Sequence, residues 1–268
     1  MTIFSKSARM TKKLLIASVL LCFGQLSHAS LVDRGGGLIY DTDLNVTWLQ
    51  DANYALTSGF ATSGTNGKMP WAEAMSWAEN LSFYDTVRNV TWTDWRLPSV
   101  SPLNGTNWYW SSSIAGSSDS SYNIGQPGTV YAGSKASELT YMFYTNLGNE
   151  ARCPSLTSWS ACKDSLNTER DPALKTGPFQ NLNGSMYWTN TNEGVPFPGD
   201  SIAVDFNGGQ YGFQGAFHGI VAQSAWAVRS GDVGVAPIPE PETYAMLLAG
   251  IGLIGVIIRL RNRQENAL

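Results

Sequence analysis

The stretch "TWTDWRLPS", Thr91–Ser99, is the densest motif of the chain. Two tryptophans and an arginine precede a Leu-Pro turn. An arginine between aromatic neighbours can stack on a ring or pair with a carboxylate. We favour a structural role for this motif and expect Trp95 to be a core residue.

Two segments on either side of the motif have helical periodicity. In Met69–Tyr84, "MPWAEAMSWAENLSFY", Pro70 suits a first turn and apolar residues recur on one face. In Ser137–Asn149, "SELTYMFYTNLGN", Ser137 can cap a helix and Gly148 can end it. We predict one helix in each segment.

Short strand patterns come before the first helix. Leu38–Tyr40 and Val46–Trp48 predict two strands joined by a polar turn. In that turn Asp41, Asp43 and Asn45 alternate like the start of a calcium loop. The glycine and the glutamate that such a loop needs further on are missing, which favours a plain turn.

The second half of the domain is rich in strand patterns. "MYWTNT" (186–191) predicts one strand, and "SIAVDFNGGQYGFQ" (201–214) predicts a hairpin that turns at Asn207-Gly208-Gly209. "SAWAVRSGD" (224–232) closes the domain, with Trp226 expected in the core. No internal repeat stands out beyond the similar stretches "YWSSS" and "YWTNT".

Residues 100–136 and 149–177 are interpreted as insertions. The first is rich in Ser, Gly and Asn, and it contains Trp108 and Trp110 without a helical or strand period that would bury them. A long, weakly structured loop of this kind is often functional or flexible.

Cys153 and Cys162 lie nine positions apart in the second insertion. In an oxidising compartment such a pair is best interpreted as a disulfide. A metal site would need further cysteines or nearby histidines, and His218 is the only histidine after the N-terminal segment.

The N-terminus has the pattern of a secretory signal peptide. Basic residues precede the uncharged apolar stretch Leu14–Phe23, and small residues stand at Ser27 and Ala29. We predict that residues 1–29 are removed by signal peptidase after Ala29.

An apolar stretch near the C-terminus indicates a membrane helix. Tyr244–Ile258 is uncharged and apolar on every side, and three arginines follow within five residues. We predict a transmembrane helix and basic cluster over residues 243–263, with the arginines on the cytoplasmic side. A buried core helix is the alternative.

Pro239, Glu240 and Pro241 stand in the linker 233–242 just before this helix. Triplet, apolar helix and basic cluster together resemble the PEP-CTERM tail of Gram-negative bacteria. The resemblance implies that exosortase, a membrane peptidase, recognises the tail and cuts near the triplet. The protein would then be held transiently in the inner membrane before it reaches the cell surface or extracellular matrix.

The charge and composition of the domain between the two terminal segments limit the classes of partner that it can bind. Residues 30–237 carry 10 Lys and Arg against 18 Asp and Glu, a net charge near −8. An acidic domain is poorly suited to nucleic acid or to anionic lipid surfaces. All ten tryptophans lie in this part, among many Ser, Thr, Asn and Gly residues, as is common in secreted β-rich and sugar-binding domains.

The order of a helix, "WTDWRLPS", "YWTNT", "AVDFNGGQYGF" and "AWAVRSGD" resembles the Lcl C-terminal-like domain over residues 37–232, apart from the first insertion. The resemblance implies an α+β, C-type-lectin-like domain over residues 30–232, with two helices and an antiparallel sheet. Such a domain is related in shape to formylglycine-generating enzymes. The calcium-dependent sugar motifs of animal C-type lectins are missing here.

No catalytic constellation stands out, so we expect no enzyme activity, no cofactor and no metal. The expected role is non-catalytic binding of exopolysaccharide or adhesion, with Trp108 and Trp110 as stacking candidates. A passive structural component of the envelope or matrix is the alternative. An enzyme related to formylglycine-generating enzymes is a more remote one.

Overall fold

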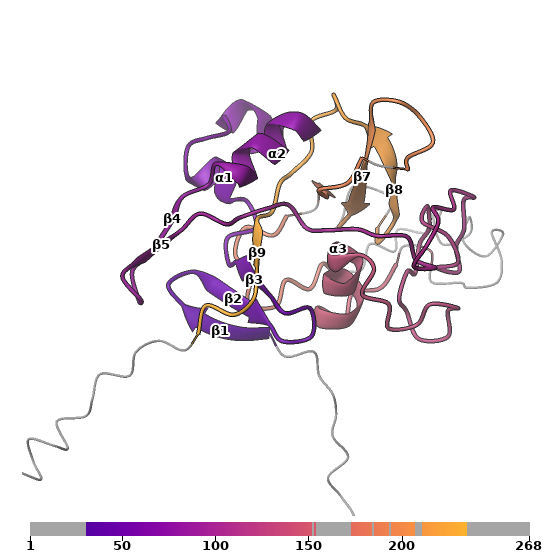
Figure 1. Ribbon diagram of the computed structural model, residues 1–268, viewed down its shortest axis with the longest axis horizontal. Coiled ribbons are helices and arrows are strands. Elements are labelled where there is room, and N and C mark those ends of the chain that lie inside the picture. The colour runs from indigo at the N-terminus through magenta and orange to yellow at the C-terminus, as the bar shows by residue number, and fades with distance from the viewer. Residues whose placement is uncertain are drawn as a thin grey trace, which may run out of the picture.

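The computed structural model describes residues 31–151, 153, 173–183, 185–192, 194–206 and 211–234. In this part the chain combines short helices with antiparallel sheets, an α+β architecture (Figure 1). The helical elements and strands are β1 (Leu31–Gly35), β2 (Leu38–Asp41), β3 (Val46–Leu49), α1 (Tyr54–Thr57), η1 (Ser63–Thr65), α2 (Trp71–Glu79), β4 (Phe83–Asp85), β5 (Val90–Trp92), α3 (Glu138–Tyr141), η2 (Met142–Asn146), β6 (Met186–Trp188), β7 (Asp200–Asp205), β8 (Gln214–His218) and β9 (Val228–Ser230).

The predicted signal peptide, the sorting triplet and the predicted helix 243–263 lie outside the described residues. Within the described part, none of the helices has the length and apolar character that crossing a bilayer requires.

The largest sheet joins the first and last strands of the domain. Its order is β1-β2-β3-β9, and each neighbouring pair is antiparallel. β6, β7 and β8 form a second antiparallel sheet, and β4 and β5 form a separate hairpin that projects to the left in Figure 1. The two ends of the described chain leave the molecule on one side, beside β1 (Figure 1).

Residues 224–230 form a seam between the two larger sheets. Ser224 O accepts a hydrogen bond from Trp188 N at 3.0 Å, at the end of β6. Val228 in β9 exchanges two backbone hydrogen bonds with Arg96, at 2.8 and 2.9 Å. The predicted closing strand is therefore confirmed, and it also holds the "TWTDWRLPS" motif in place.

Two hydrophobic clusters pack on opposite faces of this seam, because successive side chains of an extended segment point to opposite sides. Trp226 belongs to one cluster, where its ring centroid lies 4.6 Å from that of Trp48. Ala225 and Ala227 belong to the other, which also contains Trp95. Trp95 and Trp226 are 3% and 0% exposed, so their prediction as core residues is confirmed.

The two predicted helices are present, but each differs in extent. α2 follows Pro70 and ends at Glu79, whereas the predicted segment ran to Tyr84. Asn80 ends the helix by donating from Nδ2 to Ser76 O at 2.8 Å, and the aromatic residues that follow form β4 instead. The second helix has a short α-helical part, α3, followed by the π-helical turn η2.

The cap of the second helix is confirmed. Ser137 Oγ accepts from Thr140 N at 3.4 Å, and Gly148 beyond the helix has a φ of 62°. The predicted hairpin is confirmed in part: β7 pairs with β8, but β8 begins only at Gln214, the last residue of the predicted segment, and the predicted turn at Asn207-Gly208-Gly209 lies outside the described residues. Tyr211 is almost fully buried and packs against Phe143, so this part of the loop is drawn into the core and away from the strand ladder.

Two hairpins of the fold share one sequence pattern, so the expectation of no further internal repeat is wrong. "YDTDLNVTW" (40–48) and "YDTVRNVTW" (84–92) are identical at seven of nine positions. They form the β2–β3 and β4–β5 hairpins in the same register, with each tyrosine opposite a threonine. In each copy the tyrosine hydroxyl donates to the asparagine five residues later.

An aspartate organises the turn of each copy. Oδ1 of Asp41 accepts from the backbone N–H groups of the next turn residues, and Oδ1 of Asp85 does the same. The turn predicted between the first two strand patterns is thus present between β2 and β3. The copies differ in surroundings: Val46 is 2% exposed between neighbouring strands, whereas the equivalent Val90 is 40% exposed.

Candidate functional site

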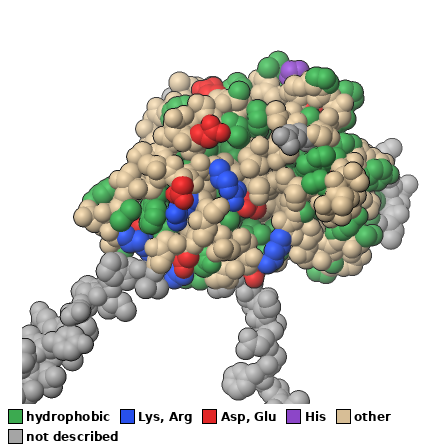
Figure 2. Space-filling model, in the orientation of Figure 1, with side chains coloured by type: hydrophobic (Ala, Val, Ile, Leu, Met, Phe, Trp, Pro, Cys, Tyr) green, Lys and Arg blue, Asp and Glu red, His purple; other side chains and the backbone are tan. Residues whose placement is uncertain are grey.

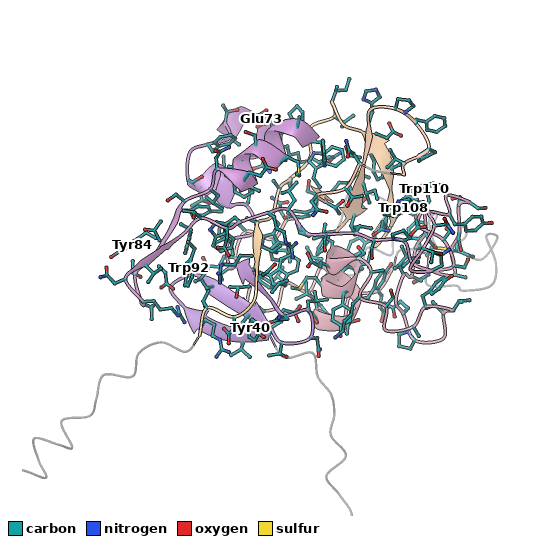
Figure 3. All side chains as sticks on the ribbon, viewed as in Figure 1. Tyr40, Glu73, Tyr84, Trp92, Trp108 and Trp110 are labelled. Carbon is teal, nitrogen blue, oxygen red and sulfur yellow. The ribbon has the colours of Figure 1, made fainter. Side chains whose placement is uncertain are left out.

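Trp108 and Trp110 lie together as a stacked pair. Their ring centroids are 5.6 Å apart and their planes differ by 16°. Both side chains are half-buried, and Tyr109 between them is 56% exposed. Figure 3 shows the pair on the right of the molecule, across the view from Tyr84 and Trp92. The exposed ring of this stretch is therefore Tyr109, which the sequence analysis did not single out.

Gly194 forms the wall behind the pair. Its carbonyl accepts from Trp110 Nε1 at 2.5 Å. A Cβ at this position would lie 1.8 Å from Trp108 Cδ1, and the φ of +68° is one that side-chain-bearing residues rarely adopt. Only glycine fits here, so two loops far apart in sequence jointly position the rings.

A buried aspartate holds the other side of the loop. Asp119 accepts from Leu103 N at 3.0 Å through Oδ1 and from Tyr109 N at 2.7 Å through Oδ2. Burial raises the pKa of Asp119 above its ordinary value, although the backbone N–H donors of Tyr109 and Leu103 oppose that rise. Both carboxyl oxygens are thus committed to fixing the backbone beside the tryptophans.

The first insertion is irregular, as predicted, but it is packed into the fold and not loosely attached. Ser121 and Gln214 of β8 exchange two backbone hydrogen bonds of 3.0 Å. Gln214 Nε2 also donates to Asp119 O at 3.1 Å. Ile114 and Tyr122 belong to the same hydrophobic cluster as Trp226.

The surface around the pair carries little charge. In Figure 2 most visible Lys, Arg, Asp and Glu side chains lie over the centre and left of this face. The right-hand part, where Figure 3 labels Trp108 and Trp110, is mainly hydrophobic and neutral polar. Such a surface can stack against an apolar ring and hydrogen-bond to neutral groups.

A small hollow, missed by the sequence analysis, lies near α1. Its volume is about 140 Å³, and the rings of Tyr54 and Phe83 lie 5.4 Å apart beside it. Pockets that enclose a drug-sized ligand have about 300–1,000 Å³, so this hollow is too small for one. No local pattern marks it, because its lining comes from separate segments: Gly37, Leu49, Gln50, Asp51, Tyr54, Phe83 and Gln180.

The other predicted site residues are only partly described. Cys153 is buried, and its carbonyl accepts from Asn123 Nδ2 at 2.7 Å. Cys162 lies outside the described residues, so the disulfide stays a prediction; Ala29 and the triplet Pro239–Pro241 lie outside as well. Among the described residues there is no group of three or more His, Cys, Asp or Glu that could hold a metal ion.

Comparison with known families identifies the C-terminal segment. Residues 237–263 match the PEP-CTERM protein-sorting motif. This motif implies processing by exosortase, a membrane protein, and therefore export to a cell-surface or extracellular destination. No curated protein and no solved structure matches the chain.

Proposed function

We propose that the mature domain is a non-catalytic binding module for polysaccharide of the cell surface or extracellular matrix. Trp108 and Trp110 are its proposed contact residues. The sorting motif supports the location, and the stacked pair supports the ligand class. A sugar ring offers an apolar C–H face for stacking and hydroxyl groups for hydrogen bonds around its edge.

The single observation that carries this proposal is that the rings are held in place in advance. Gly194 and Asp119 fix the loop from two sides. A site ordered before binding loses less conformational entropy when the ligand arrives. The exposed side chains of Thr106 and Asn107 next to the pair provide neutral polar groups for hydroxyls.

The geometry also limits the affinity. Each tryptophan gives one ring face to the other, so only the outer faces and Tyr109 are left for a ligand. We therefore propose weak contacts with one or two sugar rings at a time. Tight binding would come from many copies along one polymer.

Several finer features belong to the same proposal. The domain is proposed to have a C-type-lectin-like fold, on the basis of its resemblance to the Lcl C-terminal-like domain. The apolar C-terminal helix is proposed to anchor the chain in the inner membrane until exosortase removes it. The rival function is a passive structural component with no specific ligand.

The test is retention of the mature protein on the producer's own exopolysaccharide. A stacking ring contributes on the order of 1 kcal/mol, so Trp108→Ala/Trp110→Ala should weaken binding by about 2 kcal/mol, or roughly 30-fold. Trp92→Ala is the matched control, because Trp92 is also half-buried but lies across the molecule (Figure 3). Equal retention of the double variant removes the site assignment. No retention of any protein favours the structural role.

A further inference from the structure

Arg88, in the turn between β4 and β5, binds both ends of the described domain. Nη2 donates to Arg34 O at 2.7 Å. Nε and Nη2 donate to Gly234 O at 3.2 and 2.6 Å. Nη1 donates to Asp85 Oδ2 at 2.7 Å, and this ion pair is almost entirely buried.

A second ion pair secures the same place. Arg34 Nε donates to Asp232 Oδ1 at 2.9 Å, and its Nη2 lies 2.5 Å from Oδ2. Asp232 Oδ1 also accepts from Gly234 N at 2.9 Å. We call Arg34, Arg88, Asp232 and Gly234 the terminal clamp.

The clamp uses a position at which the two copies of the repeated hairpin differ. The residue equivalent to Arg88 is Leu44 in the first copy. There the second oxygen of Asp41 accepts from Asn146, and the turn meets the C-terminal end of the domain through a backbone carbonyl, Asn45 O, which accepts from Gly231 N at 2.8 Å. Arg88 therefore gives the exposed copy of the hairpin a side-chain link to both ends of the domain, whereas Leu44 in the buried copy has no hydrogen-bonding group.

The clamp lies directly beside the sorting motif in sequence. The PEP-CTERM match begins at residue 237, three residues after Gly234. A fully extended chain covers about 3.5 Å per residue, so Pro239, five residues on, can lie at most about 17 Å from Gly234. The folded domain must stay this close to the triplet as long as Gly234 is held.

We propose that Arg88 is a positioning residue for the sorting cut. This inference rests on the proposed processing of the tail. The clamp fixes the start of the tether, so the membrane peptidase must reach the triplet against the bulk of the folded domain. Gly231 stays bound to Asn45 O and Thr47 Oγ1 when the clamp is released. Residues 232–234 can then leave the surface, with Val233 leaving its hydrophobic cluster, which lengthens the tether by about 10 Å and speeds the cut.

The test measures the rate of tail removal from the full chain in the producing cell, by pulse labelling. We compare Arg34→Ala/Arg88→Ala, a Gly-Ser-Gly-Ser insertion after Gly234, and the two changes combined. Each single change should speed removal severalfold, and the combination should add little to either. The insertion lengthens the tether and leaves the domain unchanged. If the arginine variant acted only by destabilising the domain, its effect on the rate would add to that of the insertion.

Two controls separate this proposal from the sorting proposal. Lys135→Ala removes another cation that binds a backbone carbonyl, Asp43 O in the first hairpin, and should leave the rate unchanged. Replacing Pro239, Glu240 and Pro241 with alanine should abolish the cut, and a persistent cut would contradict motif-directed sorting. If the cut depends on the triplet but the clamp variant and the insertion match the wild-type rate, the clamp proposal alone is overturned.

Discussion

Arg96 and Glu138 form a bidentate ion pair that ties the "TWTDWRLPS" motif to the first turn of α3. Nη1 lies 2.7 Å from Oε2, and Nη2 lies 2.8 Å from Oε1. Glu138 Oε2 also accepts from Ser99 N at 2.7 Å. The sequence allowed either stacking or pairing for Arg96, and the structure shows pairing. The tryptophan at the start of the motif is instead stacked by an arginine of β9: the Arg229 guanidinium lies 4.1 Å from the centroid of the Trp92 ring.

Arg96→Ala should destabilise the domain by about 2 kcal/mol, because it leaves the buried Glu138 carboxylate without a counter-charge. Breaking a fully buried pair costs about 3–5 kcal/mol, and we expect less here since the Arg96 side chain is 28% exposed. Urea unfolding measures the change. Arg96→Lys keeps the charge but loses the second hydrogen bond, so the stability of this variant should lie between those of the wild type and Arg96→Ala. An alanine variant as stable as wild type would contradict a stabilising role.

Gly194→Ala should push Trp108 out of the stacked pair and lower retention on polysaccharide. Gly105→Ala is the matched control: Gly105 also has a positive φ, of +79°, but a Cβ added there would meet nothing within 4 Å. Both variants carry backbone strain of about 1–2 kcal/mol, and only the first disturbs the rings. Near-ultraviolet circular dichroism of the tryptophans reports the difference. Identical spectra for the two variants would rule out the role of Gly194 as the wall of the site.

The Asp94–Arg229 pair predicts an acid-dependent loss of stability. Hydrogen bonds from Arg229 hold the pKa of Asp94 below its ordinary value. The folded state therefore binds the proton less tightly than the unfolded state. The stabilisation is complete above the ordinary aspartate pKa of about 3.9 and is lost as the pH falls through the lower folded value.

We expect the stability gap between wild type and Asp94→Asn to shrink as the pH falls from about 5 to about 2.5. Thermal unfolding of both proteins across this range measures it. The raised pKa of Asp119 acts with the opposite sign, but it is present in both proteins and cancels in the difference. A gap that stays constant would show that Asp94 does not contribute through its charge.

Cys153 and Cys162 should be recovered as a linked pair by peptide mapping without reduction. Because Cys153 is buried beside Asn123, the link would tie the second insertion to the packed first one. Protein taken from the periplasm or cell surface is the sample. Two free thiols in that sample would count against the disulfide.

Alanine at Pro239, Glu240 and Pro241 should leave the protein membrane-bound at its full tail length. The reason is that the triplet opens the segment that matches the sorting motif. Mass spectrometry of the C-terminal peptide reads the outcome directly. The wild-type mature C-terminus in this variant would exclude the triplet as the recognition element.

The sequence predicted mainly those elements that depend on interactions between residues close together in the chain. The face of α2 follows from apolar spacing, and the Ser137 cap follows from one side chain and the turn after it. β1 was not predicted, because Asp33, Arg34 and Gly35 have little strand preference, and pairing with β2 overrides it. The β4–β5 hairpin was missed because its first residues extend an apparently helical segment.

The candidate site likewise combines features that local sequence predicts with features that depend on distant parts of the chain. Trp108 and Trp110 could be named as surface candidates from their polar surroundings. Their stacking, and the part played by Gly194, could not be predicted, since Gly194 lies 84 residues from Trp110 and carries no signal of its own. The role of Asp119 could not be predicted from the sequence either, because it depends on the loop that brings the backbone N–H groups of Leu103 and Tyr109 to its carboxylate.

The seam at residues 224–230 has a kinetic consequence. A ribosome makes this stretch after the rest of the domain, yet β9 completes the main sheet and Trp226 completes one of the two clusters. Contacts between segments so far apart in sequence form slowly. The upstream chain therefore lacks the last strand of its main sheet and the Trp226 side chain until the residues next to the sorting motif have been made, and we expect this to delay completion of the fold during export.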